Sequence, residues 1–247
     1  MGLDLKNLKV KLFADGAEIE VMRQMANNPL IKGFTTNPTL MRKAGIQNYE
    51  AFARQVIEEF YEYPISLEVF ADELGEMEEQ ARYLATFGQN VYVKIPVTNT
   101  KSVSAAPIIR SLARDGVKLN ITAIMSLDQV SEVADALSAD TPAYVSVFAG
   151  RIADTGCDPV PLMQESLRIL QSKPLLELLW ASPRELLNVF QADAMGCHVI
   201  TATKDILGKL GIVGKDLQEY SLETVKMFYD DACAAGYSLN VSANKSA

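Results

Sequence analysis

Short apolar runs alternate with stretches of helical periodicity along the whole chain, and this alternation is its strongest constraint on a fold. Eight runs are typical of strands: Val10–Ala14, Ile31–Thr35, Ile65–Phe70, Val91–Ile95, Lys118–Thr122, Ala143–Phe148, Leu176–Trp180 and His198–Thr201. Alternating strand and helix units indicate a parallel sheet. Eight such units in 247 residues predict a single-domain (β/α)8 barrel, or TIM barrel.

The helical stretches lie between these runs, at Glu18–Ala26, Tyr49–Phe60, Glu73–Phe87, Val103–Asp115, Leu127–Ala136, Pro161–Gln171 and Arg184–Ala192. A doubly wound open sheet is the alternative, but no GxGxxG follows the first strand. We expect one domain over residues 1–237 and a flexible tail at 238–247. An extra C-terminal helix near Leu217–Ala235 could pack on the barrel or on a neighbouring subunit.

The composition bounds the partners. The formal charge is −8 and the sequence pI about 4.8, which argues against nucleic-acid binding but leaves room for an anionic substrate held by a few arginines. No apolar run has transmembrane length, and the N-terminus lacks a signal-peptide core. Cys157, Cys197 and Cys233 are widely spaced, as expected for free thiols in a reducing compartment. We therefore expect a cytoplasmic protein with no membrane partner.

The chain has a single histidine, His198. One histidine excludes a multi-histidine metal site within the chain, and no GxSxG elbow is present to build a serine triad. His198 lies in a strand-like run, which favours a barrel-wall position over a catalytic one.

Lys94 carries a charge in the middle of Val91–Ile95, a strand that reads as buried on both faces. Burial disfavours the charged form of an amine, and a neutral lysine is a nucleophile toward carbonyl groups. The sequence thus predicts a Schiff-base enzyme. The alternative is a buried ion pair between Lys94 and Glu68 without catalysis.

Two acids follow or interrupt other strands. Asp15 ends the first strand and could cap the helix that begins near Ala17, or act as a general acid/base beside Lys94. Glu68 stands inside the third strand and needs a partner there, such as a lysine or a held water. Two carboxylates and a lysine are the set that imine chemistry requires.

Further polar residues fall at strand ends, where barrels place their active sites. Asn37 ends the second strand in a Thr35-Thr36-Asn37-Pro38 turn and could hold a substrate hydroxyl or simply shape the turn. Strand periodicity puts Asn120 and Thr122 on one face, and likewise Ser146 and Phe148.

An anion site is expected late in the barrel. Arg151 follows the sixth strand, and Ser182-Pro183-Arg184 is interpreted as the start of a helix, where backbone N–H groups attract anions. Both arginines could hold one phosphate. The alternative for Arg184 is a surface salt bridge to Glu185 or Glu177.

Three segments together resemble the transaldolase family of class I aldolases: Val93–Thr98, which carries Lys94, the Thr35–Pro38 turn and Phe148–Ile152. The resemblance implies that Lys94 forms an imine with a dihydroxyacetone unit, Asp15 accepts the proton, and Glu68 and Thr122 handle a water. It places Thr35, Asn37, Asn120, Ser146 and Phe148 at the substrate, and Arg151, Ser182 and Arg184 at a sugar phosphate. It implies no metal or organic cofactor, because the protonated imine is the electron sink, and it implies a homo-oligomer.

Two positions discriminate within that family. Fructose-6-phosphate aldolases carry Gln where Glu68 stands and Tyr where Phe148 stands, so this chain resembles the transaldolases, enzymes of the pentose phosphate pathway. Two rival readings stay open: an aldolase that releases free dihydroxyacetone, and a barrel that binds phosphosugars without turnover.

Overall fold

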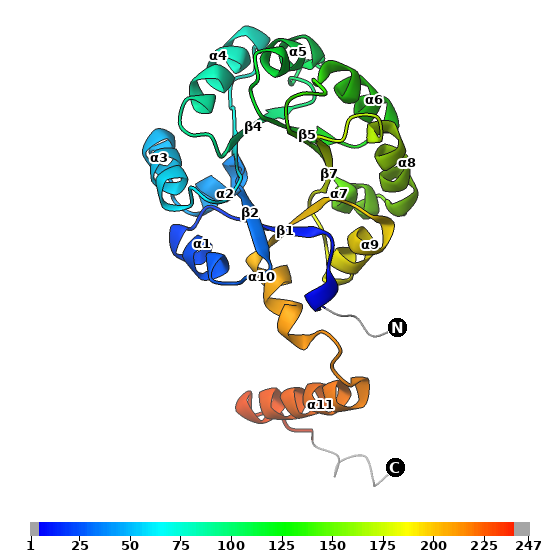
Figure 1. Ribbon diagram of the computed structural model, residues 1–247. Coiled ribbons are helices and arrows are strands. Elements are labelled where there is room, and N and C mark those ends of the chain that lie inside the picture. Colours follow the sequence, from blue (N-terminus) through cyan, green and yellow to red (C-terminus); the bar gives the residue numbers. More distant parts are fainter. Residues whose placement is uncertain (1–4, 240–247) are drawn as a thin grey trace. The chain divides into compact units, whose positions relative to one another are not determined.

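A computed structural model of the protein describes residues 5–239. Its centre is a closed barrel of eight parallel strands that pair in chain order, with β8 returning to β1 (Figure 1). The strands are β1 Lys11–Asp15, β2 Ile31–Thr35, β3 Ile65–Glu68, β4 Val91–Pro96, β5 Leu119–Ile124, β6 Ala143–Val147, β7 Leu176–Trp180 and β8 Val199–Thr203. The predicted fold is confirmed.

Some strand bounds differ from those predicted. β3 ends at Glu68, two residues before the predicted end at Phe70. β5 runs on to Ile124 through an irregularity in its pairing with β6. β8 begins at Val199, so His198 lies just before it.

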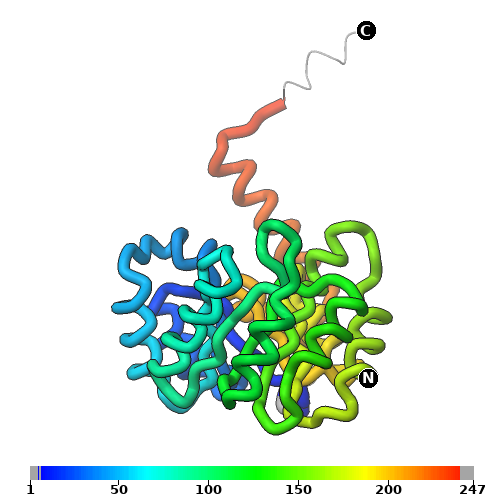
Figure 2. The backbone as a smooth tube through the Cα atoms, turned by 90° about the horizontal axis from the view of Figure 1, so that it is seen from above, coloured from blue at the N-terminus to red at the C-terminus, as the bar shows by residue number. Residues whose placement is uncertain are grey.

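Helices cover the outside of the barrel, as the view turned by 90° shows (Figure 2). They are α1 Ile19–Ala26, α2 Pro38–Lys43, α3 Tyr49–Glu59, α4 Leu74–Ala85, α5 Ala106–Arg114, α6 Leu127–Ala136, α7 Ala149–Asp154, α8 Val160–Leu170, α9 Leu187–Met195 and α10 Lys204–Leu207, with 3-10 turns at Leu5–Asn7 and Gly208–Ile212. Two predicted helix starts are wrong by three residues: α5 begins at Ala106, not at Val103, and α9 begins at Leu187, not at Arg184.

The helix α6 illustrates how local sequence sets these elements. The Ser126 side chain accepts a hydrogen bond from the backbone N–H of Gln129, and the Gln129 side-chain oxygen accepts one from the backbone N–H of Ser126. This capping box fixes the first turn. Val130 and Val133 then face inward and are buried against the sheet.

Large side chains fill the barrel below its mouth. Phe13, Tyr144 and Leu179 are buried together there, with the rings of Phe13 and Tyr144 edge to face. Gly33 makes room for the Phe13 ring, since a Cβ at residue 33 would lie 2.6 Å from its Cζ. These side chains close the interior of the barrel below its mouth, so the barrel is not a pore.

The barrel forms one compact unit, Lys6–Leu210, and the described residues from Gly211 onward belong to a second. The predicted C-terminal helix is present as α11, Leu217–Ala234. Asp216 caps its N-terminus, and none of its residues is buried. The domain bounds at 237 and 238 stay predictions, and residues 240–247 of the expected tail lie outside the described residues. Between residues 5 and 239, no helix combines the length and apolarity needed to cross a bilayer.

Candidate active site at the barrel mouth

The carboxyl ends of the strands open into a cavity of about 520 Å³. Every residue predicted for the site lines it: Asp15, Thr35, Asn37, Glu68, Lys94, Asn120, Thr122, Ser146, Phe148, Arg151, Ser182 and Arg184. Parallel strands bring these residues together because their carboxyl ends share one rim.

Lys94 lies at the centre of this group, and only 7% of it is exposed. Its Nζ is 3.1 Å from Glu68 Oε2 and donates a hydrogen bond of 3.1 Å to the backbone carbonyl of Thr36. Glu68 and Lys94 are register partners on neighbouring strands, so the sheet itself sets this contact.

Asp15 ends β1 and receives a hydrogen bond of 2.7 Å from Thr35 Oγ1, which also lies 2.6 Å from Thr201 Oγ1. Burial raises the pKa of the Asp15 carboxyl, while the positive charge of Lys94 and the bond from Thr35 oppose the rise. The alternative of Asp15 as a helix cap is wrong, because Glu18 occupies the N-cap of α1. A carboxylate with a raised pKa is suited to accept a proton.

Asn120 is completely buried between two serines. Its Nδ2 donates to Ser66 Oγ at 2.9 Å, and its Oδ1 accepts from Ser146 Oγ at 2.6 Å. Thr122, two residues along the same strand, has a buried Oγ1 with no hydrogen-bond partner among the described residues. A buried hydroxyl in that state is ready to bind a water or a reacting oxygen in the cavity.

Asn37 serves the turn as well as the cavity. Its Oδ1 accepts a hydrogen bond of 3.0 Å from the Leu40 N–H and so caps α2, where Pro38 takes the first helical position. The amide nitrogen of Asn37 remains as the group that could meet a substrate. Phe148, on the opposite side of the barrel, packs against the buried aromatic layer.

The expected anion site differs from the prediction. Ser182 does not open a helix; it has a left-handed φ of 59°, and α9 starts five residues later. Arg184 pairs with Asp154, rather than with Glu185 or Glu177, and donates to Ser182 Oγ at 3.0 Å. The guanidinium of Arg151 lies 5.7 Å from the centre of the Phe148 ring.

Sequence reasoning missed several residues of the mouth. Thr36 supplies the carbonyl that holds Lys94, and Ser66 holds Asn120. Thr201, Thr203 and Lys43 also line the cavity. Period-two spacing, which was applied to Asn120 and Thr122, would equally have grouped Ser66 with Glu68 and Thr201 with Thr203.

His198 lies at the amino end of the barrel, away from this cavity. Its Nδ1 accepts a hydrogen bond of 2.9 Å from the backbone of Leu178, and burial lowers its pKa. It precedes β8 instead of lying within the strand as predicted, and it does not line the mouth cavity. Cys157, Cys197 and Cys233 are unpaired, and burial raises the pKa of the Cys197 thiol to about 12.

A closed (β/α)8 barrel with a buried lysine beside carboxylates at its mouth has the architecture of an aldolase-type enzyme. The family model described as Transaldolase/Fructose-6-phosphate aldolase matches residues 12–245. The chain therefore belongs to the transaldolase/fructose-6-phosphate aldolase family.

Similar proteins with assigned names are consistent with this family membership. A probable transaldolase of Methanococcus maripaludis is 33% identical over 202 residues, which cover 81% of this chain and 89% of that protein. One of Dehalococcoides mccartyi is 33% identical over 199 residues, covering 80% and 88%. Among solved structures, KGPDC from Streptococcus mutans superposes with a TM-score of 0.57 at 10% identity over 81% of this chain and 90% of that one, which reflects the shared fold.

Proposed function

We propose that the protein transfers a three-carbon dihydroxyacetone unit from a ketose phosphate to an aldose phosphate through a Schiff base at Lys94. The observation that carries the proposal is the buried Lys94 amine, 3.1 Å from a carboxylate and inside a cavity lined by a second one. Neither the fold nor phosphosugar binding alone requires this arrangement.

Imine formation is the first stage. Neutral Lys94 attacks the ketone carbon of the donor, and the carbinolamine loses its oxygen as water to give a protonated imine. Glu68 is close enough to take the ammonium proton beforehand and to return one to the leaving water. The unpartnered hydroxyl of Thr122 is suited to hold that water.

Carbon–carbon cleavage follows. Asp15 takes the proton of the hydroxyl on the carbon that will become the aldehyde. The bond between that carbon and the dihydroxyacetone unit breaks, the aldehyde departs, and the bonding electrons move into the imine to form an enamine. The enamine then adds to the acceptor aldehyde, and Asp15 returns the proton to the new hydroxyl. Water adds to the resulting imine, which releases the product ketose and frees the Lys94 amine. The raised pKa of Asp15 makes it a stronger base than a free carboxylate. The imine is itself the electron sink, so this route needs no metal or organic cofactor.

The rest of the cavity suits a sugar phosphate. In the proposal Thr35, Asn37, Asn120 and Ser146 contact hydroxyl groups, and Arg151, Ser182 and Arg184 hold the phosphate. Sedoheptulose 7-phosphate and fructose 6-phosphate are donors of the required kind.

Phe148 favours transfer over release of free dihydroxyacetone. Its ring lies in the cavity wall and offers no hydroxyl to hold a water beside the imine. The enamine therefore survives long enough to meet an acceptor.

Borohydride trapping tests the proposal. Protein treated with fructose 6-phosphate and borohydride is expected to gain the mass of a reduced dihydroxyacetone adduct at Lys94, located by peptide mass spectrometry. Lys94→Met is the control and should gain none. Absence of an adduct in the native protein would refute the mechanism, whereas cleavage at the same rate without acceptor would assign the aldolase that releases dihydroxyacetone.

The proposal has a setting. Exchange of three-carbon units between sugar phosphates belongs to the pentose phosphate pathway in the cytoplasm. A homo-oligomer is part of the proposal, because α11 carries apolar side chains such as Val225 and Phe228 and buries none of them. Sedimentation of the full chain, compared with a chain ending at Leu210, tests that assembly.

A further inference from the structure

The loop after β7 meets helix α7 at a point where no side chain fits. A Cβ at Gly150 would lie 1.5 Å from the backbone oxygen of Ser182 and 2.6 Å from its carbonyl carbon. The Gly150 N–H donates to the carbonyl of Ala181 at 3.3 Å. The two backbones are thus in direct contact, and only glycine at residue 150 permits it.

Ser182 has an unfavourable backbone conformation at this contact. Its φ of 59° lies in the left-handed region, which costs free energy for a residue with a Cβ. Such a conformation persists only where surrounding contacts enforce it, and it is found most often at functional sites. The close approach of Gly150 is one of those contacts.

A second contact joins the same two segments. Arg184 Nε donates to Asp154 Oδ1 at 2.8 Å, and Arg184 Nη2 bonds to Asp154 Oδ2, so the pair is bidentate. These bonds from the guanidinium lower the pKa of the Asp154 carboxyl and keep it ionised. A bidentate pair fixes the plane of the guanidinium as well as its position.

Arg151 lies between the two contacts in the sequence of α7, one residue after Gly150 and three before Asp154. It makes no ion pair within residues 5–239. Its positive charge helps to lower the pKa of the Asp154 carboxyl. Two cations and one anion leave this group with one net positive charge facing the cavity. Because Arg184 and Asp154 neutralise each other, the remaining positive charge is that of Arg151. A positive charge at this place is suited to bind a phosphate monoester.

We infer that Gly150 and Asp154 form a clasp that sets the spacing and orientation of Arg151 and Arg184 for the phosphate end of the substrate. The inference rests on the proposed function and deepens it. Both residues are positioning residues: they act through the two arginines and Ser182, and they take no part in the chemistry at Lys94. The clasp thus determines preference for phosphorylated over unphosphorylated donors.

The test compares two donors in Gly150→Ala and Asp154→Asn. Steady-state transfer is measured with fructose 6-phosphate and with fructose, and adduct formation with dihydroxyacetone and borohydride. In both variants KM for fructose 6-phosphate should rise at least about tenfold, because a bond to a charged group is lost or misdirected. The kcat/KM for fructose and the yield of adduct should stay at the native level.

Matched controls use the same chemical changes elsewhere. Gly75→Ala adds a methyl group with no atom within 4 Å, and Glu185→Gln removes a carboxylate charge from the same loop outside the cavity lining. Both should behave as the native protein. Thermal unfolding checks that the variants fold. If Gly150→Ala does not fold, the result for Asp154→Asn alone decides the test.

Three results would overturn the clasp: equal losses on both donors, an unchanged KM for fructose 6-phosphate, or a lower KM in Asp154→Asn. The last would mean that Asp154 merely competes with phosphate for Arg184. Failure of the native protein to form an adduct with dihydroxyacetone would instead refute the proposed function, so the two failures are distinguishable.

Discussion

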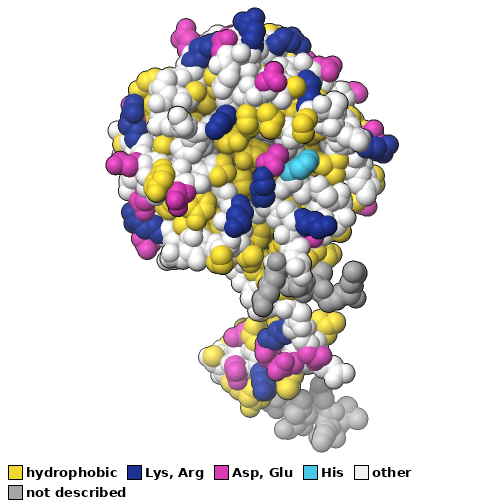
Figure 3. Space-filling model, in the orientation of Figure 1, with side chains coloured by type: hydrophobic (Ala, Val, Ile, Leu, Met, Phe, Trp, Pro, Cys, Tyr) yellow, Lys and Arg dark blue, Asp and Glu magenta, His cyan; other side chains and the backbone are white. Residues whose placement is uncertain are grey.

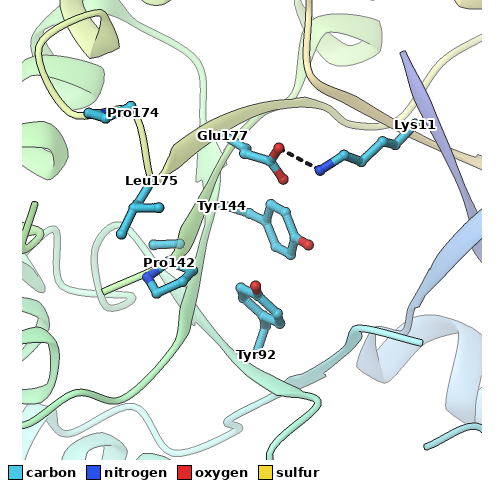
Figure 4. Close-up of a pocket in the computed structure, with 8 residues that line it drawn as sticks. Lys11, Tyr92, Pro142, Tyr144, Pro174, Leu175 and Glu177 are labelled. Atoms are coloured by element: carbon cyan, nitrogen blue, oxygen red, sulfur yellow. Dashed lines mark hydrogen bonds and ion pairs between the residues drawn. The ribbon is translucent and has the colours of Figure 1, made fainter. Parts of the chain in front are cut away.

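The barrel has a lysine–glutamate ion pair at each end, and the two differ mainly in burial. At the mouth, the Lys94 and Glu68 side chains are 9% and 17% exposed. At the amino end, the Lys11 and Glu177 side chains are 47% and 24% exposed and lie 2.6 Å apart, beside Tyr92 and Tyr144 (Figure 4).

Burial gives the same two residue types different properties. Water solvates the exposed ammonium of Lys11, so its pair with Glu177 contributes little to stability. Figure 3 shows the amino-end face, with the single histidine in cyan among charged side chains open to solvent. The Lys94 and Glu68 side chains are mostly withdrawn from water, and breaking such a buried pair is costly. In the proposed function, only the mouth pair takes part in nucleophilic chemistry.

The largest expected effect separates the two lysines directly. Lys94→Met should reduce transfer by ~10³-fold or more, since it removes the nucleophile, while the barrel still folds. Lys11→Met should leave kcat within about twofold, because its pair contributes little. Transfer rates and circular dichroism of both variants check this. A loss of activity in Lys11→Met would break the comparison between the ends.

Asp15→Asn should lower carbon–carbon cleavage by ~10²–10⁴-fold while leaving trapping by borohydride intact. The base must be ionised to work, and its pKa is raised by burial. Native activity should therefore fall on acidification at a higher pH than an ordinary carboxyl would give, and that limb should be absent from the residual activity of Asp15→Asn. A native profile that stays flat down to the pH of a free carboxyl would contradict this role.

The same shift predicts an effect on stability. A carboxyl whose pKa is higher in the folded than in the unfolded state stabilises the fold while protonated, and this stability is lost as pH rises through the folded pKa. Asp15→Asn should thus melt above the native protein at neutral pH, and the difference should shrink below the unfolded pKa. Thermal unfolding across pH measures it. A difference that grows on acidification would mean the opposite shift.

Phe148→Tyr tests whether the dry environment of Lys94, compared with that of Lys11, also limits hydrolysis of the imine. A hydroxyl at residue 148 could hold a water near the imine, so release of free dihydroxyacetone should rise severalfold relative to transfer. Assays with and without an acceptor aldehyde give the ratio. Phe148→Leu, which adds no hydroxyl, is the matched control and should not raise release.

A structural feature can be predicted from the sequence when it depends on residues that are close together in the chain. Strand and helix alternation is local, so the eight strands and the ring of residues at their ends could be predicted. The pairing of Arg184 with Asp154 joins residues 30 apart, and no pattern near either one reveals it. Ser182-Pro183 resembles a helix start, yet the contact with Gly150 holds Ser182 in a left-handed conformation that a local rule cannot anticipate.

The smallest expected effect concerns the amino end. Glu177→Gln should change the free energy of unfolding by about 0–1 kcal/mol, because the pair is largely solvated, and the change should vanish in high salt as the charges are screened. Glu68→Gln leaves a buried ammonium without its partner, so its loss should be larger and nearly independent of salt. Denaturant unfolding of both variants at low and high salt gives the two responses. If both variants showed the same salt dependence, the pair at the mouth would be as well solvated as the pair at the amino end. Burial would then not distinguish Lys94 from Lys11 as a nucleophile.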